Sequence, residues 1–404
     1  MAIVRSFKGI HPPTELAQEI IAPPYDVLDE QEARAIVARI PKSFLHVTRS
    51  EVDLPEGSDS HSKEAYAKAR ENFDAYVAKS WMVQDESPCF YVYSQTWMGR
   101  TQHGLMAVCK TADYDANIIK KHELTRPDKE QDRVDHIEAL DAQTGLVFLT
   151  YRDQYADVQG VMKEAKAIAP TWVATTDDGV THTLRIVSDV SLVQRIEGAF
   201  AAVESLYIAD GHHRSAAASR VAKARQESGD SGYFMAGIFP DSELKVLPYN
   251  RVVRDLHGYT VEDFLAQVAQ KFDVHLSGVA EPSQRKEIGM YLQGNWYTLT
   301  AKAEIITEDV VASLDVSLLQ DHVLHPLLGI ENPRTDTRIS FVGGIRGHKA
   351  LSSAVDALGT GVAFCMYATG MDQLLDVADA NRLMPPKSTW FEPKLRGGVL
   401  VHRI

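Results

Sequence analysis

The stretch from Ser205 to Arg225, SLYIADGHHRSAAASRVAKAR, constrains the fold more than any other part of this 404-residue chain. Its first residues form a short apolar run with a defined end, which is typical of a buried strand. Its second half consists of strong helix formers. A single glycine, Gly211, separates the two patterns. The sequence therefore predicts a strand that passes into a helix at Gly211 and His212.

The first turn of this predicted helix is a natural place for an anion. Its backbone N–H groups lack intrahelical partners and lie at the positive end of the helix dipole, a position that suits phosphate. Gly211 allows the backbone to come close, and Arg214 can hold two phosphate oxygens. His212 and His213 add donors. Asp210 has the wrong charge for phosphate, but it suits a bridging metal ion or a hydroxyl that loses a proton. A capped turn with half-buried histidines is the alternative.

Hairpins and helices are interspersed along the rest of the chain. Hairpin patterns surround Gly99 and Asp178–Gly179, and a third turns at Gly294–Asn295. The aromatic run from Phe90 to Trp97 suits the core of the first hairpin, and Thr260 suits the start of a helix. This mixture favours an α+β (mixed α/β) protein over a regular doubly wound sheet.

The charge balance bears on the choice of partner. The chain has 42 Lys and Arg against 55 Asp and Glu, a formal net charge of −13. Nonspecific binding of nucleic acid depends on basic side chains, so nucleic acid is not an expected partner. The three cysteines form no metal or disulfide pattern, which fits a reducing cytoplasm. No stretch has the apolar length of a membrane helix or signal sequence, so we expect a cytoplasmic protein without a membrane span.

A second polar cluster lies in IIKKHELTRPDKEQDRVDH, residues 118–136. His122 and Glu123 place a histidine beside a carboxylate, and proton abstraction from an alcohol requires such a base with a neighbour that orients it. Both side chains could also bind a metal, although one HE pair is not the zinc-protease pattern. A solvated charged loop is the alternative.

Three further segments hold polar side chains in a constrained backbone. MPPKSTWFEPK places Lys387, Ser388 and Thr389 between prolines, where they can face an anion. Asp26, after the double proline of IAPPYDVL, is either a capping residue or a competing base. The arginine-rich segment NPRTDTRISFVGGIRG is either a second anion site or a surface salt-bridge network.

The stretch ADGHHRSAAA resembles the phosphate-binding motif of the ParB/sulfiredoxin-like superfamily, which includes nucleotide-binding domains of partition proteins, sulfiredoxins and free-serine kinases. Over nearly its whole length the chain is similar to domain-of-unknown-function family 1015. That similarity is carried by IAPPYDVL, by HELT followed by DR, by ADGHHR and by MPPKSTWFEPKLRGGVL. The resemblance implies a ParB/sulfiredoxin-like core in which the helix N-terminus holds nucleotide phosphates, elaborated by additional hairpins and helices. Unlike a partition protein, the chain has no evident helix-turn-helix after the motif.

The expected organisation has three regions. They are an N-terminal α+β region at 1–110, a ParB-like nucleotide-binding core with the HELT and DGHHR motifs at 111–255, and a C-terminal α+β region at 256–404.

These observations favour an enzyme, a nucleotide-dependent phosphotransferase (kinase) whose partners are a nucleotide, ATP or ADP, and a small hydroxylated metabolite, possibly free serine. Glu123 is the expected general base, oriented by His122, and Asp210 is the expected catalytic ligand of Mg²⁺. The residues expected to bind the nucleotide are Gly211, His212, His213, Arg214, Lys387, Ser388 and Thr389.

Two other functions stay open. The first is a ParB-like nucleotide-binding or nucleotide-hydrolysing switch protein with a macromolecular partner. The second is a metal-dependent hydrolase whose ligands are His122, Glu123, Asp210 and His212.

Overall fold

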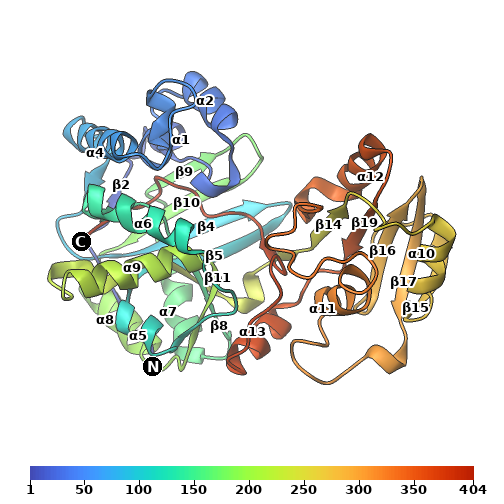
Figure 1. Ribbon diagram of the computed structural model, residues 1–404. Coiled ribbons are helices and arrows are strands. Elements are labelled where there is room, and N and C mark those ends of the chain that lie inside the picture. Colours follow the sequence, from blue (N-terminus) through green and yellow to red (C-terminus); the bar gives the residue numbers. More distant parts are fainter. The chain divides into compact units, whose positions relative to one another are not determined.

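The computed structural model describes residues 1–404, which form two compact units. The first unit comprises Met1–Leu244 together with Pro393–Ile404, and the second comprises Lys245–Glu392. The expected regions 1–110 and 111–255 lie for the most part in the first unit. The division into three regions stays a prediction. Figure 1 shows the helices and strands of both units.

The first unit is built on a nine-stranded mixed sheet. β11 (Leu206–Asp210) pairs in parallel with β6 (Ile119–Lys120) and antiparallel with β8 (Val147–Tyr151), and β12 (Tyr233–Pro240) pairs in parallel with β8 and antiparallel with β5 (Arg100–Lys110). A mixed α/β fold is therefore confirmed. The strand order is β6 (Ile119–Lys120), β11 (Leu206–Asp210), β8 (Val147–Tyr151), β12 (Tyr233–Pro240), β5 (Arg100–Lys110), β4 (Phe90–Trp97), β10 (Thr181–Val187) and β9 (Trp172–Thr175), with β1 (Val4–Arg5) beside β5.

Two of the predicted hairpins form in this sheet. β4 and β5 are joined at Met98 and Gly99, whose φ angles of 48° and 75° match the two positive φ values of a type I′ turn. β9 and β10 are joined around Gly179, with a φ of 76°. The aromatic run of β4 belongs to the core, since Phe90 and Tyr91 are fully buried. Local turn chemistry and alternation thus predicted these strands correctly.

Helices cover the sheet on both faces because the strand residues alternate in direction. Val147 and Leu149 of β8 join an apolar cluster with Val158 of α7 and Ile196 of α8. α6 and α9 pack against each other through a separate cluster (Figure 1). The helices of the unit are α1 (Ala17–Ile20), α2 (Glu30–Arg39), α3 (Leu45–Thr48), α4 (Lys63–Ala78), α5 (Thr111–Asp115), α6 (Pro127–Leu140), α7 (Ala156–Ala167), α8 (Val190–Phe200) and α9 (His212–Ala224).

The predicted strand–glycine–helix corner is also confirmed. β11 ends at Asp210 and α9 begins at His212, with Gly211 between them at φ 96° and ψ 29°. This left-handed conformation is strained for any residue with a Cβ atom, which explains the glycine.

The second unit contains a six-stranded antiparallel sheet. Its β16–β17 hairpin turns at Gln293 and Gly294, one residue before the predicted pair, because Asn295 already pairs with Leu292. Thr260 caps α10 as predicted, accepting from the Asp263 N–H. The sheet order is β15 (Phe272–Ser277), β17 (Asn295–Ala301), β16 (Glu287–Leu292), β19 (Val362–Met366), β14 (Tyr249–Val253) and β18 (Ile339–Gly343), and the helices are α10 (Val261–Val268), α11 (Asp315–Leu319), α12 (Gly347–Leu358) and α13 (Met371–Asp379).

Three small two-stranded sheets complete the fold: β2 (Ile10–His11) with β3 (Val83–Gln84), β7 (Ala142–Gln143) with β21 (His402–Arg403), and β13 (Val246–Leu247) with β20 (Trp390–Phe391). The β7–β21 pairing ties the C-terminal segment to the first unit. None of the helices combines the length and the apolar character that a membrane crossing requires.

Candidate active site

Asp210 lies at the end of β11 in a strongly charged setting. Its Oδ2 accepts a hydrogen bond from Lys394 Nζ at 2.9 Å, and its Oδ1 accepts one from the Gly211 N–H at 2.8 Å. Burial by itself would raise the pKa of Asp210, but the charges of Lys394 and Arg214 outweigh it and hold that pKa well below the usual range. Asp210 is therefore an ionised carboxylate with one ammonium partner. Sequence reasoning missed Lys394, although it stands inside the C-terminal segment that carries the family resemblance.

Arg214, on the first turn of α9, is largely buried, with 13 % of its side chain exposed. Its guanidinium donates to the Leu146 carbonyl and to Asp26 Oδ2, the latter at 3.3 Å, and lies over the Tyr25 ring at 5.9 Å. Burial opposes the charge of Arg214, but Asp26 and Tyr25 raise its pKa further above the usual value. Asp26 thus pairs with the arginine of the motif.

The fold brings together residues from two separate sequence motifs, namely His122 and Glu123 from one and His212 from the other. Because β6 and β11 run parallel, the residues that follow them meet at one edge of the sheet. The rings of His122 and His212 are 4.6 Å apart between centroids and nearly perpendicular. One potential ligand atom from each of the three residues lies within 4.8 Å of the other two.

The two histidines of this cluster are neutral at pH 7. Burial lowers the pKa of His122 to about 4, although Asp210 and a hydrogen bond with the Ile208 backbone act in the other direction. Burial and the neighbouring His122 lower the pKa of His212 well below its usual value. His122 Nδ1 and His212 Nε2 are buried without a hydrogen-bond partner. The cluster therefore presents two uncharged imidazole nitrogens beside a carboxylate.

His213 connects the DGHHR motif to the start of α6. Its Nε2 accepts a hydrogen bond from the backbone N–H of Arg126 at 3.0 Å, and Arg126 is the residue that precedes α6. This bond leaves Nδ1 as the ring nitrogen that carries the proton when the imidazole is neutral. A role of His213 in phosphate binding stays a prediction.

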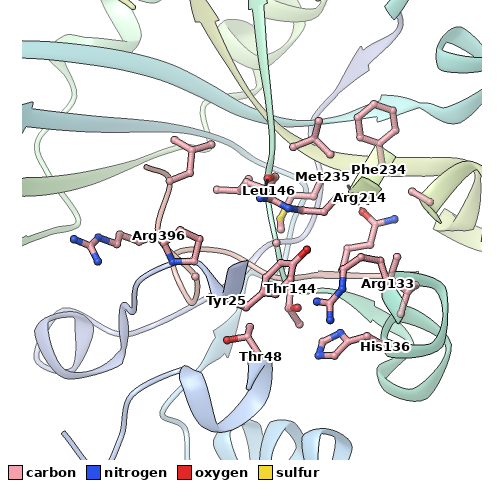
Figure 2. Close-up of a pocket in the computed structure, with 18 residues that line it drawn as sticks. Tyr25, Thr48, Arg133, His136, Thr144, Leu146, Arg214, Phe234, Met235 and Arg396 are labelled. Atoms are coloured by element: carbon pink, nitrogen blue, oxygen red, sulfur yellow. Dashed lines mark hydrogen bonds between the residues drawn. The ribbon is translucent and has the colours of Figure 1, made fainter. Parts of the chain in front are cut away.

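A small cavity with a volume of about 40 Å³ lies beside Arg214 (Figure 2). Arg133 of α6, Arg214 of α9 and Arg396 of the C-terminal segment line it together with Tyr25, and no acidic side chain is among the lining residues. The Arg133 guanidinium stacks on the Tyr25 ring at 3.9 Å. Each guanidinium also contacts one carboxylate outside the lining, from Asp132, Asp26 and Asp178 respectively. Sequence reasoning missed Arg396, whose position depends on the return of the C-terminal segment.

Lys387, Ser388 and Thr389 belong to the second unit. Ser388 Oγ donates to the Pro385 carbonyl at 2.6 Å, and the Lys387 ammonium lies over the Tyr249 ring at 5.4 Å. Binding of a nucleotide by these three residues stays a prediction. In the same unit, Arg338 pairs with Asp336 at 2.9 Å, as expected for the salt-bridge interpretation of that segment.

These features define a mixed α/β protein with a strand–glycine–helix corner, an arginine-lined cavity and a buried histidine–carboxylate cluster. The chain belongs to the family described as "Protein of unknown function (DUF1015)", whose model matches residues 4–317. The family predicted from the sequence motifs is confirmed. No curated protein matches the chain.

Several solved structures are similar to part of the chain. A variant of free serine kinase in complex with ADP is 11% identical with a TM-score of 0.35, and the match covers 71% of this chain and 87% of that chain. A C-terminally truncated SbnI from Staphylococcus aureus is 11% identical with a TM-score of 0.38, covering 72% and 85%. A conserved hypothetical protein from Pyrococcus furiosus is 11% identical with a TM-score of 0.34, covering 71% and 90%. Similarity at this level does not by itself define an activity.

Proposed function

We propose that this protein is a cytoplasmic nucleotide-dependent phosphotransferase that phosphorylates a hydroxyl group of a small metabolite, with the ParB-like DGHHR corner as its phosphate site. The observation that carries the proposal is the arginine-lined cavity. Three arginine residues and no acidic residue line it, in a chain whose formal net charge is −13. Arginine side chains can hold phosphate oxygens through paired hydrogen bonds, which suits a phosphate-containing ligand.

The DGHHR corner contributes Arg214 to this cavity. The first N–H groups of α9 follow Gly211, and Arg214 extends from the same turn to the cavity wall. ATP or ADP, when bound, supplies the phosphoryl group for transfer. Arg214 would hold phosphate oxygens, while Asp210 would contribute to an Mg²⁺ site, because its two oxygens keep lone pairs beyond the two hydrogen bonds that they accept.

Glu123 is the proposed acceptor of the proton from the metabolite hydroxyl, with His122 as the neighbour that positions it. The supporting observation is the proximity of Glu123 to His122 and His212 at the corner that starts α9. A base must lie within hydrogen-bond reach of the proton that it takes, and the fold places Glu123 beside the DGHHR motif. Free serine is the first acceptor to test because of the motif resemblance.

The experiment is a product assay on the full-length protein. ATP or ADP with Mg²⁺ is incubated with a panel of hydroxylated metabolites that includes serine, and phosphorylated products are identified by mass spectrometry. Thermal unfolding with each nucleotide is measured in parallel, since a ligand bound only by the folded state raises its stability. Absence of both a stability shift and a product would contradict the proposal. Nucleotide turnover that rises with duplex DNA and with no metabolite would instead support the switch-protein alternative.

A further inference from the structure

We propose that His122, Glu123 and His212 bind one divalent transition-metal ion of the zinc class. This site is separate from the arginine-lined cavity, since none of the three residues lines that cavity. The inference goes beyond the proposed function: it concerns the ligands of an ion and not the nucleotide, and it shares only Glu123 with that proposal.

The unsatisfied nitrogens of the two histidines are the first line of evidence. His122 is 2% exposed and His212 is 6% exposed, and each has one buried ring nitrogen without a hydrogen-bond partner. Leaving a buried polar atom unpaired costs about 1–3 kcal/mol, so two such atoms in adjoining rings call for a common partner. His402 also has an unpartnered Nε2, but it is not a member of such a cluster.

The donor set is the second line of evidence. Two imidazoles and one carboxylate form a ligand set typical of catalytic zinc, with three protein ligands and one open position, and imidazole favours zinc, iron or cobalt over magnesium. Metal bonds of about 2.0–2.2 Å place the ligand atoms of one ion roughly 3–4 Å apart. The ligand atoms here all lie within 4.8 Å of one another. Small side-chain rotations would therefore bring them onto one ion.

The surroundings of the cluster support this assignment. A hydrogen bond with the Ile208 backbone orients His122, as second-shell partners of metal-bound histidines usually do. Asp210 adds negative charge nearby, partly balanced by Lys394. Lys121 adds a positive charge near His212. Its ammonium lies over the Tyr114 ring at 4.0 Å and donates a hydrogen bond to the Tyr114 carbonyl.

A metal at this position would change the role of Glu123 in phosphotransfer. With an ion bound, Glu123 would serve as a ligand, and the ion would supply the activation of a hydroxyl group in place of a carboxylate base. Without the ion, Glu123 acts as the base itself.

The test is a metal titration of the chelator-treated full-length protein. Co²⁺ is followed by visible absorption, Zn²⁺ by calorimetry, and Mg²⁺ serves as the comparison ion. We expect one Co²⁺ per chain with the intense absorption bands of a four- or five-coordinate site, displaced by Zn²⁺ and not by equimolar Mg²⁺. Absence of Co²⁺ binding below millimolar concentration, or the weak bands of an octahedral aqua ion, would overturn the proposal.

Matched variants identify the ligands. His122→Asn and His212→Asn should each weaken Zn²⁺ binding by more than the roughly 10–100-fold that loss of a second-shell partner costs. His402→Gln, which changes another buried histidine with an unpartnered nitrogen, should leave Zn²⁺ affinity unchanged. Unchanged affinity in folded His122→Asn and His212→Asn proteins would refute the assignment.

Two further measurements keep the test decisive. If the histidine variants do not fold, long-range ¹H–¹⁵N spectra of the wild-type protein should show His122 Nδ1 and His212 Nε2 shifting when Zn²⁺ is added, and unshifted signals would count against the site. ADP binding is measured separately in the metal-free protein. Zn²⁺ binding without nucleotide binding would contradict the proposed function alone, and nucleotide binding without Zn²⁺ binding would contradict this inference alone.

Discussion

Replacing Arg214 tests the phosphate site most directly, because its guanidinium belongs both to the first turn of α9 and to the cavity wall. Arg214→Ala should weaken ADP binding by about tenfold to a hundredfold, the roughly 1.5–3 kcal/mol of a charge-assisted hydrogen bond. Calorimetric titration of the folded variant with ADP measures this loss.

The contacts of Arg214 in the structure also indicate how much Arg214→Ala should lower the free energy of unfolding. Arg214→Ala removes the donor that reaches the carbonyl of the buried Leu146, which should lower the free energy of unfolding by about 1–3 kcal/mol. Asp26 loses its partner too, but 41 % of its side chain is exposed, so water can replace the guanidinium at little cost. The variant should therefore fold with a lower melting temperature, which circular dichroism checks before the titration.

Asp26→Asn is the control variant, because it is not expected to weaken ADP binding as Arg214→Ala does. In the structure Asp26 Oδ2 lies 3.3 Å from Arg214 Nη2 and competes with any anion for that guanidinium. A half-exposed ion pair is worth at most about 1 kcal/mol, so Asp26→Asn should leave ADP affinity unchanged or raise it by up to about fivefold. Unchanged ADP affinity in a folded Arg214→Ala protein would refute the phosphate site. Equal losses in both variants would show that the Arg214–Asp26 pair acts only through the fold.

Four further predictions follow from the same contacts. Glu123→Gln should lower turnover by roughly a hundredfold or more with little change in nucleotide affinity, measured by steady-state kinetics; normal turnover would remove Glu123 from catalysis. Gly211→Ala should lower the free energy of unfolding by about 1–2 kcal/mol, because φ is 96° there and a residue with a Cβ atom is strained in that conformation. Gly179→Ala should cost less in urea titrations, because its φ of 76° lies closer to the left-handed minimum. Stability should fall as the pH drops from about 6.5 to 4, because burial lowers the pKa of His136 and of His402 to about 4, so the unfolded chain binds more protons in that window. Urea titrations across this range should show a loss of up to about 3 kcal/mol per histidine, with a smaller pH dependence in His402→Gln, and a flat profile would contradict the assignment. No gel shift of duplex DNA is expected at submicromolar protein and physiological salt, given the net charge of −13; a salt-sensitive shift would favour the switch protein.

Local features of the sequence determined the elements on which the site is built. The passage from β11 to α9 was predictable because Gly211 and the alanine-rich run act through backbone preferences that operate over a few residues. The hairpin at Gly99 and the cap at Thr260 were predictable for the same reason. The two polar motifs, HELT and DGHHR, were also recognisable, because their residue types indicate chemistry whatever the fold.

Only the tertiary structure decided which of these residues meet. His122 reaches His212 because β6 pairs in parallel with β11, and no local preference encodes that pairing. Lys394 bonds to Asp210 across 184 residues because the C-terminal segment returns to the first unit. Such contacts arise when distant apolar faces are buried together, so the charges that they bring into one site depend on packing of the whole unit. The sequence alone determined the strand–glycine–helix corner, and long-range packing determined the arginine-lined cavity and the histidine cluster.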